Sequence, residues 1–401
     1  MRLSTILILA TTTLLASCTS IPQYAGSCEN EYAVLDAEFE GARVSGCKAE
    51  KTGFRIQIDP EDKPINPSPW YAFRVTPKQV GDITVEINYS HAAHRYRPKR
   101  SEDATRWRLV DEARVSEMNS GKRVALRLSL GDEPFFISAQ ELLLTGAYEK
   151  WINDLIERVS LESRVIGESV EKRQLIGVFS KPEPGLTKKE HVLLIGRQHP
   201  PELTGAFAMQ AFVETVFADT TLSSDFRNRF HITVIPLLNP DGVVHGHWRH
   251  NMNGVDLNRD WGPFTQPETQ AVKRLLDDIA SEPDSELRLM LDFHSTNRNV
   301  FYVQPDEDET VPPRFVADWI DAAPTRLPQY DFERADRFQT ALATSKNYVY
   351  GRFGAPGITY ELGDQTDRQL IDASARVFAQ EMMQTLLASD SSLEDKAKPS
   401  E

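Results

Sequence analysis

The chain has 401 residues, 40% of them apolar and 26% charged, which is ordinary globular composition and predicts two domains of roughly 100–250 residues each. The formal net charge of −14 excludes a general attraction to nucleic-acid phosphates. The one compact basic stretch has no aromatic partners spaced like a platform for stacking bases. We therefore expect no nucleic-acid partner, and we interpret that stretch as a solvated loop: Arg95, Arg97, Lys99 and Arg100.

The first residues have the pattern of a secretion signal. Met1-Arg2-Leu3 gives a charged start, residues 6–16 are apolar apart from threonines, and small residues precede Cys18. A cysteine at that position resembles the signal of bacterial lipoproteins, which implies removal of residues 1–17 and acylation of Cys18. Plain secretion, with an incidental Cys18, is the alternative. The resemblance, with Thr19 next in the chain, predicts a lipid-anchored protein of the bacterial cell envelope, at the outer membrane and facing the periplasm.

Two further sequence features fit that location. No later run approaches the roughly 20 apolar residues of a membrane span, so a lipid would be the only anchor. Cys28 and Cys47 are the cysteines left after Cys18, and an oxidising periplasm favours one disulfide between them. Two buried free thiols are the alternative.

Residues 31–145 have the period-two pattern of antiparallel strands. Apolar and polar residues alternate along 54–58, 83–89 and 124–130, and prolines and glycines separate the runs. One buried face on each strand predicts a small antiparallel β-sandwich of immunoglobulin-like or jelly-roll type, after an anchor and linker over residues 18–30.

The period changes near Ala147, and strands and helices alternate from there on. Helices are predicted over 147–159, 205–216 and 267–279, and strands over 192–195, 231–238, 287–293 and 357–360. This alternation predicts an α/β domain over residues 146–388, with a mostly parallel sheet flanked by helices. Residues 389–401 are short and polar, and we expect a disordered tail.

Three possible metal ligands follow the ends of predicted strands. His199 and Glu202 come after the 192–195 strand, and His294 comes after the 287–293 strand. Open α/β sheets place their sites at the carboxyl ends of strands. Two imidazoles and one carboxylate leave an open position on a tetrahedral zinc ion, which is the catalytic pattern. The sequence therefore predicts one catalytic Zn²⁺ site.

Other polar residues could supply the remaining chemistry. Glu361 follows the strand at 357–360 and is a candidate general base. Arg249 could hold a carbonyl oxygen as it gains charge, and Asn258 with Arg259 suits a terminal carboxylate. His245, His247 and His250 could form a rival metal site, but no carboxylate accompanies them at suitable spacing, and we interpret them as polar loop residues.

Six motifs in one order carry a family resemblance: HPPE, NPDG, WR, GVDLNRDW, DFHS and YELGD. In this order they resemble the funnelin family of zinc carboxypeptidases. A β-sandwich before the catalytic domain, the WYAFRV segment at 70–75 and Trp107 resemble the cytosolic-carboxypeptidase branch. The resemblance implies a carboxypeptidase-like mixed sheet and a metallopeptidase that hydrolyses the C-terminal peptide bond. Pro201 and His247 depart from that branch, where glycine and asparagine are usual.

The resemblance also implies roles for individual residues. His199, Glu202 and His294 would hold zinc, Glu361 would act as base and Arg249 would stabilise the oxyanion. Lys346 falls where the family sets its preference for the departing residue, and a lysine there would favour an acidic one, with Arg352 as a second candidate. The family's mobile tyrosine is Tyr348 or Tyr350.

The sequence is also compatible with two rival functions. A zinc amidohydrolase or deacylase of related fold shares the metal set but lacks the NPDG and GVDLNRDW segments. A non-catalytic envelope binding protein would have lost a ligand or the base, and none is missing. The substrate is open between a scavenged peptide, a protein tail and a muropeptide from the cell wall.

Overall fold

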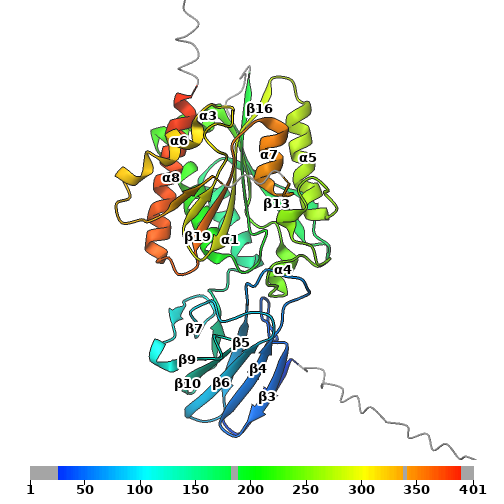
Figure 1. The fold of residues 1–401 in the computed structure, drawn as a ribbon, viewed down its shortest axis with the longest axis vertical. Coiled ribbons are helices and arrows are strands. Elements are labelled where there is room, and N and C mark those ends of the chain that lie inside the picture. Colours follow the sequence, from blue (N-terminus) through cyan, green and yellow to red (C-terminus); the bar gives the residue numbers. More distant parts are fainter. Residues whose placement is uncertain (1–25, 182–187, 337–340, 390–401) are drawn as a thin grey trace, which may run out of the picture.

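The computed structural model describes residues 26–181, 188–336 and 341–389. An all-β body built from the first part of the chain adjoins an α/β body built from the rest (Figure 1). The predicted signal sequence, the lipidation residue Cys18 and the predicted tail from 390 onward lie outside the described residues. No helix of the described residues has the length and apolar character needed to cross a membrane.

The all-β body is a sandwich of two sheets. Its apolar core takes the alternate residues that the sequence pattern indicated, and Phe54, Ile56 and Ile58 are almost completely buried. One sheet has the order β1 (Ser27–Glu29), β2 (Ala33–Asp36), β5 (Ala72–Pro77), β11 (Phe135–Ser138), β7 (Lys99–Ser101) and β8 (Arg108–Leu109). The other has the order β3 (Gly46–Glu50), β4 (Gly53–Ile58), β6 (Gly81–Tyr89), β10 (Arg123–Leu130) and β9 (Val115–Met118).

Two features of the sandwich concern how its strands are joined. Strands β4 and β6 pair in parallel. The prediction of an entirely antiparallel sandwich is therefore wrong for this pair. The reason is that β5 lies between them in sequence but belongs to the other sheet, which makes the connection a crossover. A disulfide joins Cys28 of β1 to Cys47 of β3, with 6.1 Å between their Cα atoms, and links the two sheets.

The interpretation of the basic stretch as a solvated loop is correct for Arg97, which is exposed, but wrong for Arg95, Lys99 and Arg100. Arg95 forms an ion pair with Asp364 of the α/β body. Lys99 is buried in β7, and the Arg100 guanidinium lies 3.6 Å from the ring centre of Phe135. Tertiary contacts remove these three basic side chains from water, and the composition of the segment gives no sign of those contacts.

The α/β body is built on one mixed sheet of eight strands. Four of its seven strand pairings are parallel, including those of β14 with β16 and of β16 with β19 at the centre. This confirms the predicted mixed, mostly parallel sheet. Its order is β12 (Leu161–Glu168), β13 (Gln174–Ser180), β15 (Phe230–Ile235), β14 (Lys189–Gly196), β16 (Ser285–Thr296), β19 (Gly357–Gly363), β17 (Val300–Tyr302) and β18 (Glu333–Ala335).

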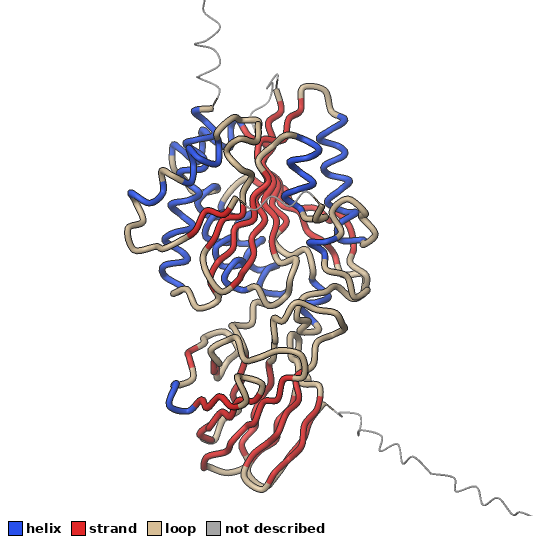
Figure 2. The backbone as a smooth tube through the Cα atoms, viewed as in Figure 1, coloured by secondary structure: helices blue, strands red, loops and turns tan. Residues whose placement is uncertain are grey.

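Helices cover both faces of this sheet (Figure 2). On β14, Val192 and Leu194 join one apolar cluster while Leu193 and Ile195 join another. A strand buried on both faces therefore has a continuous apolar run. The first cluster packs against α1 (Thr145–Arg158), α2 (Leu203–Val216), α3 (Thr221–Arg229), α6 (Phe315–Ile320) and α8 (Arg368–Ala388). The second packs against α5 (Pro267–Ser281) and α7 (Ser345–Phe353).

Candidate active site

The central parallel strands bring the predicted site residues together at their carboxyl ends. His199 and Glu202 lie in the turn between β14 and α2. His294 and Glu361 lie directly opposite each other on β16 and β19. Both strands continue past the predicted ends, because their ladder runs on to Thr296 and Gly363. His294 and Glu361 are thus fixed by sheet hydrogen bonds and do not sit on free loops.

His199, Glu202 and His294 form a group that can hold a metal ion. Nδ1 of His199 lies 2.9 Å from one carboxylate oxygen of Glu202, and Nδ1 of His294 lies 2.7 Å from the other. The two Nδ1 atoms are 3.2 Å apart. All three side chains are buried, and within the described residues this is the only such cluster of His, Cys, Asp or Glu.

Two further carboxylates hold the outer nitrogens of these histidines. Nε2 of His199 lies 2.9 Å from Asp256, and Nε2 of His294 lies 2.9 Å from Asp292. This contact directs each Nδ1 toward the centre of the group, which is how histidine ligands are oriented in metal sites. Sequence reasoning missed both carboxylates, although they lie inside the GVDLNRDW and DFHS motifs.

The arrangement fits zinc. It offers two nitrogens and a carboxylate with no thiolate, the donor set of a catalytic zinc site. A tight helix contact also fixes His294: a Cβ added to Gly205 of α2 would lie 2.4 Å from the His294 carbonyl oxygen. Only glycine allows this approach without a shift of the backbone.

Glu361 has the environment of a general base. Burial raises the pKa of its carboxyl to about 7, and the negative charge of Glu202 adds to this against the opposing charges of His294 and Arg249. Its Oε2 has no hydrogen-bond partner among the described residues. A carboxylate with a pKa near neutrality and a free oxygen can both accept and return a proton.

Four further predicted residues, Arg249, Asn258, Arg259 and Lys346, line the same cavity, which has a volume of about 340 Å³. Arg249 donates from Nε to Asp256 at 2.6 Å, so Asp256 links this arginine to His199. Asn258 lies in a short 3-10 turn (Leu257–Arg259), with Nδ2 3.4 Å from Nε2 of His294. The lining comprises His199, Glu202, Arg249, Asn258, Arg259, His294, Lys346 and Glu361, among others.

The structure separates Lys346 from the two predicted tyrosines. Lys346 lines the cavity, and burial lowers its pKa to about 8. Tyr348 packs against Trp261 and Phe264, and neither it nor Tyr350 is among the described residues of the lining. The cavity tyrosine is Tyr302, which sequence reasoning missed because no predicted motif includes β17.

Arg352 and the histidine-rich segment also lie away from the metal group. Arg352 pairs with Asp277 at 2.6 Å and does not line the cavity. His245 contacts Glu171, and His250 contacts Asp62. The described residues place no metal-binding group at these histidines.

The β-sandwich contributes residues that no motif indicated. The Glu61 carboxylate accepts hydrogen bonds from three consecutive backbone N–H groups, those of Trp248, Arg249 and His250, at 2.7 to 2.8 Å. Burial opposes its charge, but His247 and the N–H groups of His250 and Trp248 hold the pKa of Glu61 below its usual value. Three sandwich residues also line the cavity: Asn66, Ser68 and Arg95.

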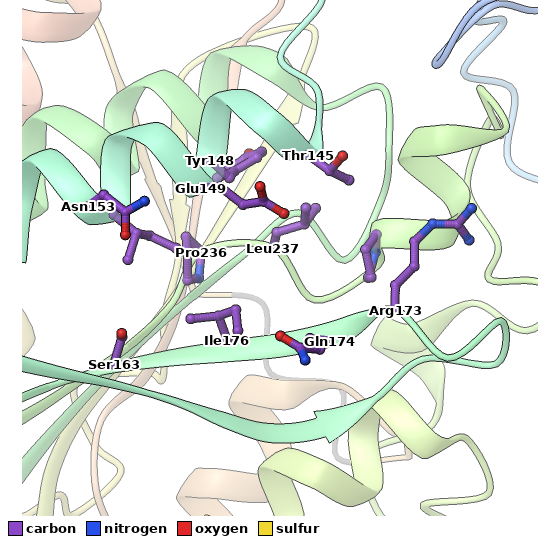
Figure 3. Close-up of a pocket in the computed structure, with 12 residues that line it drawn as sticks. Thr145, Tyr148, Glu149, Asn153, Ser163, Arg173, Gln174, Ile176, Pro236 and Leu237 are labelled. Atoms are coloured by element: carbon purple, nitrogen blue, oxygen red, sulfur yellow. The ribbon is translucent and has the colours of Figure 1, made fainter.

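A larger hollow of about 530 Å³ lies elsewhere, between α1 and the strands β12 and β13. Figure 3 shows Tyr148 and Glu149 of α1 above Ile176 and Gln174 of β13. Arg173 at its edge is engaged by Asp241 and Glu171. The metal-binding group of the described residues lines the smaller cavity.

The fold and this site together define a metallohydrolase-type centre, in which a buried His-Glu-His group faces a carboxylate base. The family model described as zinc carboxypeptidase matches residues 148–387. The chain belongs to that zinc carboxypeptidase family.

Sequence relatives and solved structures agree with this assignment. The chain is 33% identical over 154 residues to cytosolic carboxypeptidase 6 of Mus musculus. This alignment covers 36% of this chain and 28% of the relative. It is 23% identical over 316 residues to cytosolic carboxypeptidase 3 of Mus musculus, covering 71% of this chain and 31% of the relative. The chain thus spans about a third of the length of these curated relatives.

The fold is that of solved bacterial metallo-carboxypeptidases. The structure from Burkholderia cenocepacia has a TM-score of 0.76 at 16% identity, covering 89% of this chain and 99% of that one. A metallo-carboxypeptidase from Pseudomonas aeruginosa, solved in complex with (2-guanidinoethylmercapto)succinic acid, has a TM-score of 0.70 at 19% identity, covering 91% and 100%. Both similarities extend over the sandwich as well as the α/β body, because they cover nearly the whole described chain.

Proposed function

We propose that this protein is a zinc-dependent carboxypeptidase that hydrolyses the C-terminal peptide bond of peptides. One observation carries the proposal: the His-Glu-His group, the base Glu361 and the polar pair Asn258 and Arg259 share one cavity. A binding protein needs no base of this kind. A cavity of about 340 Å³ suits the end of a peptide chain.

His199, Glu202 and His294 would hold the zinc ion. When bound, zinc supplies Lewis acidity, which polarises a carbonyl group and lowers the pKa of water. Glu361 takes a proton from the attacking water on its free Oε2 and returns it to the leaving amine. A pKa raised to about 7 matches both steps near neutral pH.

Arg249 and the Asn258–Arg259 pair orient the substrate. The Arg249 guanidinium, held by Asp256, can stabilise the negative charge that develops on the scissile carbonyl oxygen. Asn258 and Arg259 can bind the free terminal carboxylate, and this contact would restrict cleavage to the last peptide bond. Asn258 is preorganised for this role, because its side-chain oxygen accepts the Ser345 N–H at 3.0 Å.

Lys346 supports a preference for acidic C-terminal residues. It lines the cavity that contains the terminal-carboxylate pair, and burial has removed much of its hydration. A desolvated ammonium group gains most from a carboxylate partner. The proposed substrates are therefore peptides or muropeptides with an acidic end.

We also propose that the enzyme works in the bacterial cell envelope, anchored by a lipid on Cys18. The support is the charged, apolar and small-residue pattern of residues 1–18, and the disulfide between Cys28 and Cys47 fits an oxidising compartment. Labelled palmitate should enter the wild-type protein in cells and should not enter Cys18→Ser. Equal labelling of both proteins would contradict the proposed lipid anchor on Cys18.

The enzymatic proposal is tested with zinc-loaded protein and a panel of peptides and muropeptides. Mass spectrometry should detect loss of single C-terminal residues from free peptides and no cleavage of the same peptides with C-terminal amides. A deacylase would instead release an acyl group from both sets. Cleavage of the amides at equal rate would contradict the assigned role of Asn258 and Arg259.

A further inference from the structure

The catalytic cavity has a wall that belongs to the β-sandwich. Arg95 precedes β7 in the sequence, yet its side chain lines the cavity together with Glu202 and Glu361 of the α/β body. The side chain is 25% exposed, so it faces the cavity without being a free surface group. No motif of the catalytic domain contains this residue.

Contacts from both bodies fix the Arg95 guanidinium. Nε donates to Asp364 at 2.8 Å, and Nη1 donates to the buried Ser68 hydroxyl at 2.8 Å. Asp364 is held in turn, because its own N–H donates to the Thr296 carbonyl at 2.7 Å. Nη2 of Arg95 has no hydrogen-bond partner within the described parts of the chain. The guanidinium is thus preorganised, with one nitrogen left to bind a ligand.

Strand β19 shows where Arg95 lies relative to the scissile bond. The backbone of Lys346 packs against Gly357, four residues before Glu361, whereas Arg95 is anchored at Asp364, three residues after it. At about 3.3 Å per strand residue, these anchors are about 13 Å before and about 10 Å after Glu361. A peptide whose last residue lies at the Lys346 end and whose chain follows β19 passes Arg95 on the N-terminal side of the scissile bond.

We propose that Arg95 is a substrate-binding residue that selects acidic side chains on the N-terminal side of the scissile bond. This inference rests on the proposed carboxypeptidase function and adds a second specificity site, supplied by the β-sandwich. A guanidinium with a free N–H pairs with a carboxylate more strongly than with a neutral amide. The preferred substrates would then carry a run of acidic residues, with Lys346 engaging the last one and Arg95 an earlier one.

The test compares two peptides with the same C-terminal residue, one ending in Glu-Glu-Glu and the other in Gln-Gln-Glu. We expect wild-type protein to favour the first by about tenfold or more in kcat/KM, and Arg95→Gln to reduce this ratio to near one. Arg95→Lys should keep part of the preference. Arg97→Gln is the matched control, because Arg97 is exposed, pairs with Glu112 and lies outside the cavity, and it should keep the full ratio.

Several outcomes would overturn the inference. The inference is wrong if wild-type protein cleaves the two peptides with equal kcat/KM. It is also wrong if Arg95→Gln keeps the ratio of kcat/KM values that the wild-type protein shows. Calorimetric binding of the two peptides to wild-type and Arg95→Gln protein gives a second measurement. If wild-type protein binds both peptides but cleaves neither, the proposed enzymatic function fails, and a binding ratio that depends on Arg95 still supports the acidic site.

Discussion

Replacing Glu61 with Gln tests whether the β-sandwich sets the geometry of the active site. One oxygen of Glu61 accepts the N–H groups of Arg249 and His250, and the other accepts that of Trp248. The Gln amide oxygen can keep the first two bonds, but its NH2 group then faces the Trp248 N–H. One buried donor is left unpaired at a cost of about 1–3 kcal/mol, and two charge-assisted bonds become neutral, each weaker by about 1 kcal/mol.

A loss of about 3–5 kcal/mol at this contact should let the segment that carries Arg249 shift. If Arg249 stabilises the oxyanion, its displacement costs about 10²- to 10³-fold in kcat, as for removal of one oxyanion donor. Steady-state kinetics should show this loss with a smaller change in KM, while zinc content and far-UV circular dichroism stay as in wild type. Glu112→Gln is the matched control, since Glu112 is an exposed sandwich carboxylate paired with Arg97. A folded Glu61→Gln protein with wild-type kcat would refute the reasoning.

Four other changes test separate parts of the site. Glu361→Gln should retain zinc by atomic absorption while turnover falls by several orders of magnitude, and an active zinc-loaded variant would contradict its role as base. Gly205→Ala should weaken zinc affinity in a chelator titration, because its Cβ would meet the His294 backbone, and unchanged affinity would count against that contact. Lys346→Glu should lower activity on C-terminal glutamate far more than on leucine; equal losses would remove the acidic preference. Lys346 is charged below its lowered pKa of about 8, so the wild-type preference for glutamate over glutamine should disappear as pH rises from 7 to 9, whereas a flat ratio would exclude this lysine.

Much of the catalytic centre could be predicted from the sequence because its residues follow strand ends. His199 and Glu202 follow an apolar run, His294 follows another, and Glu361 follows a third. Parallel buried strands align their carboxyl ends, which brings His199 and His294, 95 positions apart, to one edge of the sheet, and the order of the motifs supported their grouping. The two outer carboxylates, Asp256 and Asp292, could have been found in the same motifs by asking what holds each imidazole.

Other features depend on contacts that no local pattern encodes. Side-chain packing decides that Tyr302 lines the cavity, because β17 brings it there, whereas Tyr348 packs against Trp261 and Phe264. The solvent exposure of the basic stretch at 95–100 could not be predicted, because a run of charged residues does not show which side chains other parts of the protein will bury.

The sequence by itself predicted the order of helices and strands, two domains and the ligand atoms for one metal ion. It could do so because the hydrophobic period and the chemistry of each residue are local properties. Only the tertiary structure decided that Glu61, Ser68 and Arg95 of the sandwich meet the cavity of the α/β body. These contacts join residues up to about 270 positions apart and depend on how two separately patterned bodies pack. The physical reason is that a docking geometry is set by the shapes and charges of two finished surfaces, which exist only once both bodies have folded.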